Sequence, residues 1–167
     1  GPAWIVDPAL GSAAWVAQTL ERLDVTPVAV LDTHGHWDHV VENHVWAAQG
    51  LPVWVGAGDE DWLQAPAPFN PALFGNPPPT PGVTPARVLA DGDVLELGAL
   101  RFRMIATPGH SDDSVTLILD DGLAFTGDLP PPFMAPDESG AVERSWEAVR
   151  ARGVHTVYPG HGPSFRL

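Results

Sequence analysis

Three histidines and an aspartate crowd into the segment Thr33-His34-Gly35-His36-Trp37-Asp38-His39. Imidazole nitrogens and carboxylate oxygens are ligands for divalent metals, and the chain has no cysteine that could supply a thiolate. The chain has only seven histidines in 167 residues, so chance is a poor explanation for three of them within six positions. The segment is therefore predicted to bind metal, in preference to being a polar turn that happens to be rich in histidine.

The flanking residues predict how this segment is positioned. An apolar run at 28–32 is typical of a buried strand, and apolar spacing over 37–49 favours a helix that ends at Gly50. A strand that runs into a loop and then into a helix constrains the backbone directions. The four polar side chains of the segment can therefore surround one small volume.

Three further segments each end an apolar run in a glycine-containing turn that carries a histidine or an aspartate. They are Thr107-Pro108-Gly109-His110, Thr126-Gly127-Asp128 and Tyr158-Pro159-Gly160-His161-Gly162. With the first segment, and in this order, they resemble the ligand motifs of the metallo-β-lactamase superfamily. The resemblance covers nearly the whole chain and implies a four-layer αββα sandwich.

The remaining pattern predicts an α+β fold that agrees with this implication, with two mixed sheets face to face and helices outside. Strands are expected at 3–7, 27–32, 51–56, 87–90, 94–97, 100–105, 115–119, 123–126 and 154–158. Besides 37–49, helices are expected at 12–23, with Ser12 as N-cap, and at 59–63 and 139–152. We expect a single domain over 1–167 that lacks the additional N-terminal hairpin usual in the family.

Two proline-rich segments are expected to border the active-site mouth. Residues 65–85 contain eight prolines, which exclude a helix or a central strand, and the resemblance places this segment at the mouth. Phe69, Leu73 and Phe74 are its candidate lining residues, and a stiff loop that only packs on the scaffold is the alternative. Residues 129–136, with Phe133 and Met134, are a candidate second wall.

The resemblance implies a dinuclear site and assigns its ligands. His34, His36 and His110 hold one ion, Asp38, His39 and His161 hold the second, and Asp128 bridges them. Two zinc ions are the expected cofactor, with iron or manganese as alternatives. Asp38 is the expected catalytic residue, because a metal-bound carboxylate lies within reach of the bridging water and can shuttle its proton.

These ligands predict a metal-dependent hydrolase similar to glyoxalase II-like and lactonase-like enzymes. Metals about 3.5–4 Å apart can share a water and present hydroxide to the carbonyl of a small ester, thioester or lactone. Three alternatives stay open. They are a mononuclear iron, persulfide dioxygenase-like oxidoreductase, a β-lactamase-like amide hydrolase, and a metal-binding domain without catalytic activity.

The composition of the chain limits the classes of binding partner and the location that we expect. The formal charge of −13 disfavours nucleic acid, and no apolar run approaches the roughly 18 residues that span a membrane. No secretory signal is visible, so we expect a cytoplasmic enzyme with a small-molecule substrate and possible homo-oligomerisation, its natural N-terminus being uncertain.

Four polar residues outside the predicted ligand set have no assigned role. A structural or surface role is favoured for His44, inside the predicted helix, and for His155, in the last predicted strand. Asp112 and Asp113 follow His110, where they either orient imidazoles or form a solvated turn. The turn is favoured.

Overall fold

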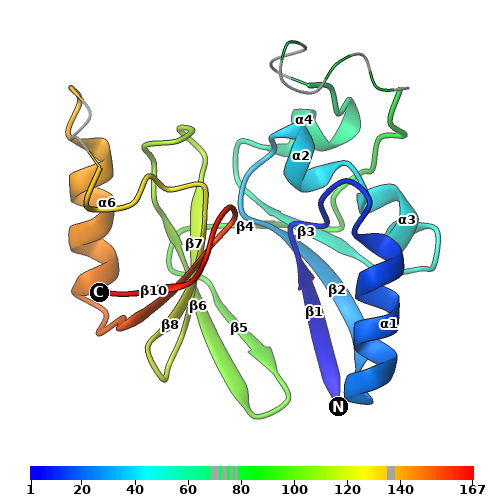
Figure 1. Cartoon of the computed structure of the whole chain (residues 1–167), viewed down its shortest axis with the longest axis horizontal. Helices are drawn as coiled ribbons and strands as arrows, with labels where there is room; N and C mark the ends of the chain where they lie inside the picture. Colours follow the sequence, from blue (N-terminus) through cyan, green and yellow to red (C-terminus); the bar gives the residue numbers. More distant parts are fainter. Residues whose placement is uncertain (69–71, 73–74, 76, 78, 135–137) are drawn as a thin grey trace. The chain divides into compact units, whose positions relative to one another are not determined.

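The chain forms two compact units, Gly1–Val88 and Leu89–Leu167, each built on one β-sheet (Figure 1). The computed structural model describes residues 1–68, 72, 75, 77, 79–134 and 138–167. Among these described residues, no helix has both the length and the apolar character that a membrane span needs.

The first unit contains a four-stranded sheet in the order β1-β2-β3-β4. Its strands are β1 Pro2–Val6, β2 Thr26–Asp32, β3 Val53–Gly56 and β4 Arg87–Leu89, the last residue of β4 being the first of the second unit. β1 and β3 both pair parallel with β2, and helix α1, Ala13–Leu23, connects β1 to β2. The predicted order of strand, helix and strand at the start of the chain is confirmed, and the helix connects two parallel strands.

Among the described residues of this unit, three short helices with defined bounds follow β2 and β3. They are α2 Trp37–Val40, α3 Asn43–Ala47 and α4 Glu60–Gln64. The prediction of one continuous helix over 37–49 is therefore wrong. Glu42 donates its N–H to the carbonyl of Pro8 at 3.2 Å and has non-helical dihedral angles, φ −103° and ψ 9°, so the helix is interrupted there by a contact with the β1–α1 loop.

The same glutamate corrects the prediction for the start of α1. Ser12 occupies the N-cap position, but its dihedral angles are helical and its hydroxyl makes no capping bond. The Glu42 carboxylate instead accepts the N–H groups of Gly11 and Ala13, both at 2.6 Å, and the Ser12 hydroxyl donates to it at 3.1 Å. A carboxylate about 30 positions away thus satisfies the N–H groups that a local cap would serve.

One face of α1 packs on the core of the first unit. Ala13, Val16 and Leu20 lie against it, whereas Ala17 is exposed. The buried core residues come from all three parallel strands and from α2, α3 and α4: Ile5, Val30, Val40, Trp46, Val53, Val55 and Leu63. Packing of this core, more than helix propensity, holds such short helices in place.

The second unit contains a six-stranded sheet in the order β10-β9-β8-β7-β6-β5. Its strands are β5 Val94–Leu97, β6 Leu100–Ala106, β7 Val115–Leu119, β8 Leu123–Gly127, β9 Thr156–Pro159 and β10 Phe165–Arg166. Neighbouring strands are antiparallel except β8 and β9, which are parallel. β7 and β8 form a hairpin about residues 120–122, with Gly122 at φ 88°.

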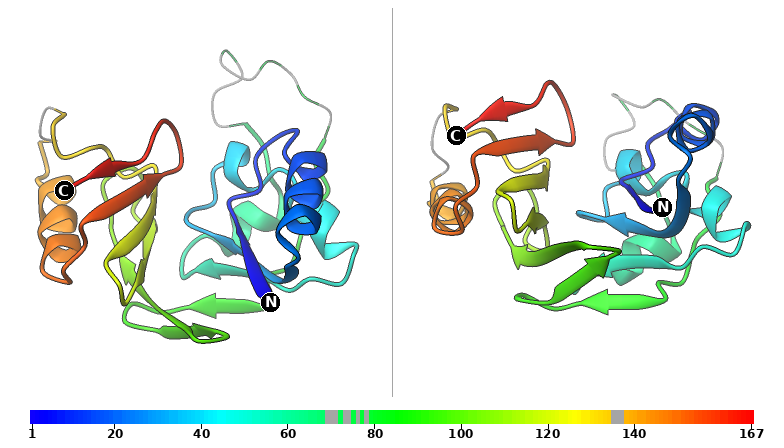
Figure 2. Two further views of the ribbon diagram at one scale, coloured as in Figure 1. Left: turned by 60° about the horizontal axis from the view of Figure 1, so that its bottom comes forward. Right: turned by 90° about the horizontal axis from the view of Figure 1, so that it is seen from below.

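Helix α6, Ala141–Arg150, runs along one face of this sheet (Figure 2). Trp146 and Val149 are buried against Ile105, Ile118, Ala124 and Val157 of the strands. The Trp146 indole N–H also donates to the carbonyl of Pro130 at 2.7 Å. This hydrogen bond ties the segment that follows β8 to the helix.

Replacement of Glu42 by alanine is expected to lower the free energy of unfolding by about 1–2 kcal/mol, because the first turn of α1 loses its cap. The measurement is urea unfolding of metal-free protein. The matched control is Glu21→Ala on the exposed side of α1, for which a change within about 0.5 kcal/mol is expected. Equal effects of the two substitutions would contradict the capping role of Glu42.

Candidate metal centre

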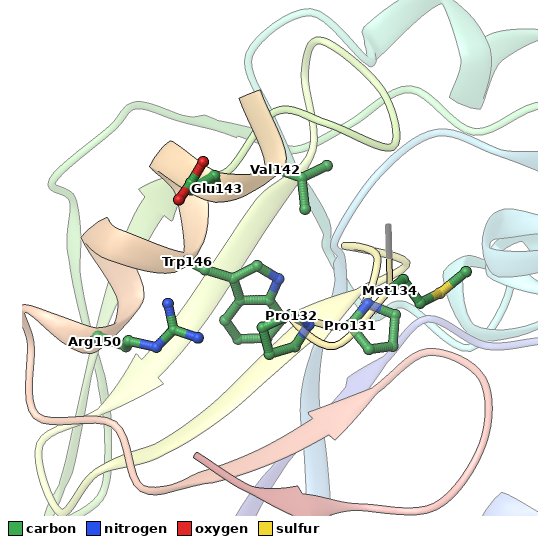
Figure 3. A pocket seen from close by; sticks show the side chains of 7 residues that line it. All are labelled: Pro131, Pro132, Met134, Val142, Glu143, Trp146 and Arg150. Atoms are coloured by element: carbon green, nitrogen blue, oxygen red, sulfur yellow. The ribbon is translucent and has the colours of Figure 1, made fainter. Parts of the chain in front are cut away.

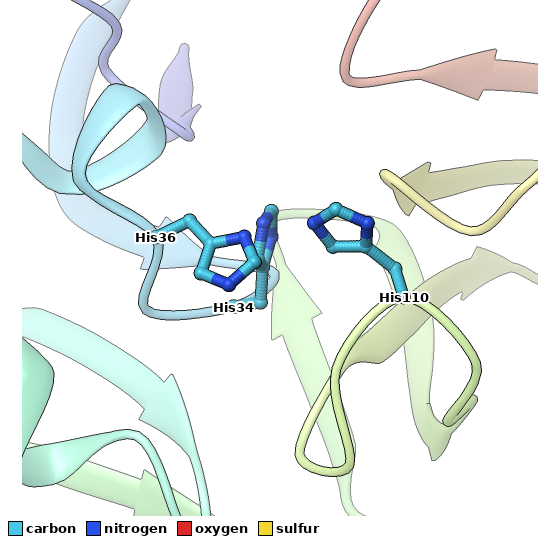
Figure 4. A group of neighbouring side chains, drawn as sticks. All are labelled: His34, His36 and His110. Atoms are coloured by element: carbon cyan, nitrogen blue, oxygen red, sulfur yellow. The ribbon is translucent and has the colours of Figure 1, made fainter. Parts of the chain in front are cut away.

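The loop after β2 gathers the four ligand candidates of the first unit. The His34 ring centroid lies 4.7 Å from that of His36 and 4.2 Å from that of His39. His34 and His36 offer ring nitrogens within 4.8 Å of one another, and Asp38 and His39 offer donor atoms within the same limit. Figure 4 shows His34 and His36 on this loop. His34 and His39 are buried, and His36 and Asp38 are partly exposed.

Asp7, which follows β1, holds this loop through the parallel pairing of β1 and β2. The register pairs Val6 with Leu31, so the residues after the two strands meet at the same sheet edge. The Asp7 carboxylate accepts the Thr33 N–H and the Thr33 hydroxyl, both at 2.7 Å. Asp7 adopts φ 50°, a left-handed conformation that aspartate tolerates better than most residues.

The same carboxylate orients His39. Asp7 Oδ2 lies 3.1 Å from His39 Nδ1, and an ionised carboxylate can only accept a hydrogen bond, so the proton is favoured on Nδ1. His39 Nε2 then carries the lone pair and lies 3.7 Å from Asp38 Oδ2. A carboxylate behind a ligating imidazole is a common arrangement in metal sites. Sequence reasoning missed this role, because Asp7 and His39 are far apart in the chain.

Asp32 is a second carboxylate that sequence reasoning did not single out. It is fully buried, and its Oδ2 accepts the Asn43 side-chain amide at 2.7 Å. Burial raises the pKa of Asp32 well above its usual value, and the nearby negative charge of Asp7 raises it further. The charged form of Asp32 is therefore disfavoured at the base of the loop.

The second unit gathers the other three candidates, His110, Asp128 and His161, at the ends of β6, β8 and β9. Asp128 Oδ2 lies 3.6 Å from His110 Nε2 and 3.6 Å from His161 Nε2. The parallel register pairs Gly127 with Pro159, and the Gly160 N–H donates to the carbonyl of Gly127 at 2.8 Å. Adjacent strand ends therefore deliver Asp128 and His161 to one place.

Gly109 permits close packing of the His110 loop on α6. It has φ +144°, and a Cβ built on it would lie 2.7 Å from Val142 Cγ2. The Ser145 hydroxyl donates to the Pro108 carbonyl at 2.7 Å and adds a second attachment to the helix. Any other residue at position 109 would be strained and would push His110 away from the helix.

The donor atoms fit a divalent metal in chemistry and in spacing. Nitrogen and oxygen ligands at tetrahedral zinc lie about 2.0–2.1 Å from the ion, which puts them roughly 3.3 Å apart. The separations of 3.6 Å around Asp128 and 3.7 Å between Asp38 and His39 are close to this value. They are too long for good hydrogen bonds. The first unit thus offers four of the seven predicted ligands and the second unit three; their division between two ions stays a prediction.

The histidines outside the predicted ligand set make contacts that agree with the structural roles favoured for them. His44 Nδ1 lies 3.0 Å from the carbonyl of Val41, one turn earlier in the chain. His155 bonds the Asp121 carbonyl through Nε2 at 2.8 Å and the Thr156 hydroxyl through Nδ1 at 2.9 Å, which ties β9 to the β7–β8 turn. Asp112 is exposed in the turn after His110.

A pocket of about 260 Å³ lies between α6 and the segment that follows Asp128 (Figure 3). Its walls are largely apolar, with one acidic and one basic side chain: Pro131, Pro132, Met134, Val142, Glu143, Trp146 and Arg150. Phe133 and Met134, predicted as a second wall of the mouth, are 76% and 59% exposed. Residues 135 and 136 of this predicted wall lie outside the described residues.

Within the 65–85 segment, residues near the C-terminal end of the segment pack on the rest of the first unit. Thr80 accepts the Trp37 indole N–H at 3.1 Å, and the Val83 N–H donates to the Leu63 carbonyl at 2.8 Å. The predicted lining residues Phe69, Leu73 and Phe74 lie outside the described residues.

Comparison with known sequences identifies one family. A model of the Metallo-beta-lactamase superfamily matches residues 1–161. The probable metallo-hydrolase YqgX of Bacillus subtilis is 30% identical over an alignment of 170 residues that covers 95% of this chain and 79% of that protein. The hydroxyacylglutathione hydrolase GloC of Haemophilus influenzae is 29% identical over an alignment of 131 residues that covers 75% of this chain and 59% of that protein. An uncharacterized Mycobacterium tuberculosis protein is 32% identical over 146 residues, and the matched part is 74% of this chain and 60% of that protein.

Comparison with solved structures points to the same fold as the sequence relatives. The B3 metallo-beta-lactamase BLEG-1 has a TM-score of 0.80 and 26% identity, with 99% of this chain and 83% of that chain covered. The protein TTHA1623, solved in a di-iron-bound form, has a TM-score of 0.75 and 28% identity, with 96% and 82% covered. The predicted fold class, an α+β metallo-β-lactamase fold with two sheets and helices, is confirmed.

Replacement of Asp32 by asparagine is expected to stabilise the metal-free protein at neutral pH. As the pH rises above about 4, Asp32 ionises in the unfolded chain before it ionises in the folded protein, where its pKa is raised, so the wild type loses stability that asparagine does not lose. Urea midpoints should therefore diverge in favour of Asp32→Asn as the pH rises from about 4. The control is Asp61→Asn at an exposed position of α4. A pH-independent difference would contradict the raised pKa of Asp32.

Proposed function

Because this chain belongs to the metallo-beta-lactamase superfamily, we propose that it is a dinuclear metal-dependent hydrolase of small esters, thioesters or lactones. The observation that carries the proposal is that each unit gathers its own cluster of histidine and aspartate donors where strands end. The chain spans about 60% of the length of its mycobacterial relatives. What the whole protein does is therefore also part of this proposal.

In this proposal the two units are the halves of one domain over residues 1–167. His34, His36 and His110 bind one ion, Asp38, His39 and His161 bind the other, and Asp128 bridges them. The donor set is imidazole and carboxylate alone, which suits zinc and also iron or manganese. The di-iron form of TTHA1623 supports keeping iron among the candidates.

The chain's own residues would share the work of hydrolysis as follows. When bound, the two ions would lower the pKa of a water molecule and polarise the substrate carbonyl. Asp38 would accept a proton from this water molecule while the water oxygen adds to the carbonyl carbon. Asp38 then returns the proton to the departing thiolate or alkoxide as the C–S or C–O bond breaks. Asp7 keeps His39 in the tautomer that presents Nε2.

The substrate is proposed to be small and partly apolar. The pocket beside the Asp128 segment offers proline, methionine, valine and tryptophan side chains to an acyl or leaving group. The name of GloC, a hydroxyacylglutathione hydrolase, supports thioesters as the first class to test. The excess of acidic residues supports a small molecule in preference to nucleic acid.

Replacement of Asp128 by alanine is expected to lower metal content and abolish hydrolysis together, because this carboxylate contacts both His110 and His161 and is proposed to bridge the ions. The measurements are metals per chain by elemental analysis and turnover of a thioester and lactone panel. Wild-type protein should hold about two metals per chain if the site is dinuclear.

The control for this prediction is Asp112→Ala, which removes an exposed carboxylate two residues after His110 and should leave metal content and turnover unchanged. Wild-type turnover by Asp128→Ala would remove Asp128 from the site. One iron per chain, no hydrolysis and oxygen consumption with a persulfide would favour the oxidoreductase alternative.

A further inference from the structure

Asp59 lies outside every ligand motif, yet its side chain contacts the metal-binding loop. It is 1% exposed, and its Oδ1 accepts the N–H of Gly35 at 2.8 Å. Gly35 is the residue between His34 and His36, the two proposed ligands of one ion. The hydrogen bond therefore fixes the orientation of the peptide group that joins these ligands.

The bond to Gly35 is made at the expense of the helix that Asp59 begins. Asp59 is the N-cap residue of α4, and aspartate at this position ordinarily accepts an N–H from the first turn of its own helix. Here the side chain makes no capping hydrogen bond, and its Oδ1 is directed to the loop instead. Because Asp59 bonds the loop and not the first turn of its own helix, we infer a role beyond the stability of α4.

Trp62, one turn further along α4, closes the other side of Gly35. A Cβ built on Gly35 would lie 2.5 Å from Trp62 Cβ and 2.7 Å from Asp59 Oδ1. The Trp62 ring also stands edge-on to His36, with centroids 6.2 Å apart and an interplanar angle of 84°. The backbone at Gly35 thus has no room to move toward α4 and is held from there by a hydrogen bond.

We propose that Asp59 and Trp62 are positioning residues that clamp Gly35 and so set the relative placement of His34 and His36 for metal binding. The inference rests on the proposed metal site. The clamp acts before metal arrives, because its contacts involve only the protein. Ligands held in place in advance lose less conformational freedom on binding, and partners behind the ligands commonly contribute 10–100-fold to metal affinity.

The decisive variant is Asp59→Ser. Serine is a good N-cap and restores the bond within α4, but its hydroxyl is too short to reach the Gly35 N–H. Asp59→Asn is the conservative variant, since its amide oxygen still reaches Gly35. Asp61→Ser, at an exposed position of the same helix, is the matched control.

Three measurements are made on each variant. Cobalt(II) affinity, by competition with a chelator, and the visible absorption spectrum of the bound cobalt report on ligand placement. Hydrogen exchange at the Gly35 amide in metal-free protein reports on the clamp itself. Asp59→Ser should bind cobalt about 10–100-fold more weakly, with an altered spectrum and faster Gly35 exchange, whereas Asp59→Asn and Asp61→Ser should resemble wild type.

The results separate the clamp from its alternatives. Wild-type cobalt affinity, spectrum and Gly35 exchange in Asp59→Ser would overturn the clamp and leave Asp59 as part of the helix only. If Asp59→Ser does not fold, Gly35→Ala tests the same contact from the loop side and should show the same loss of affinity. A wild-type protein that takes up no cobalt would contradict the proposed function. In that case the exchange at Gly35 would still decide whether the clamp exists.

Discussion

The metal-binding loop depends on backbone hydrogen bonds that leave the loop. The N–H groups of Thr33 and Gly35 are buried and find their acceptors on Asp7 and Asp59, which lie 26 and 24 positions away in the chain. A buried N–H without an acceptor costs about 1–3 kcal/mol, so these two carboxylates largely decide whether four ligand candidates can sit in one tight turn. Much of the first unit serves to bring those carboxylates there.

The scaffold achieves this by strand pairing and by short, well-packed helices. The parallel register of β1 on β2 places Asp7 beside Thr33, and α4 is held by burial of Leu63 in the core. In the second unit, the pairing of β8 with β9 plays the corresponding part for Asp128 and His161. Both clusters thus use an elementary property of sheets, namely that neighbouring parallel strands end at one edge.

Sequence reasoning identified most strands and all four motif segments, because each is a local pattern. It was wrong where a distant residue overrode a local preference. Glu42 interrupts the helix expected over 37–49 and takes over the cap expected from Ser12. Sequence reasoning also missed β10, since two residues are too few to show alternation. Of the seven predicted metal ligands, four lie in the first unit and three lie in the second.

The sequence by itself determined the chemistry of the site. Histidine and aspartate at strand ends, with no cysteine, restrict any metal to nitrogen and oxygen donors. Only the tertiary structure decided what holds those donors, because Asp7, Asp32 and Asp59 look like ordinary polar residues in the chain. Their roles arise from register, burial and the direction of one hydrogen bond. A local pattern does not encode such long-range contacts, since they exist only after the strands have paired and the helices have packed.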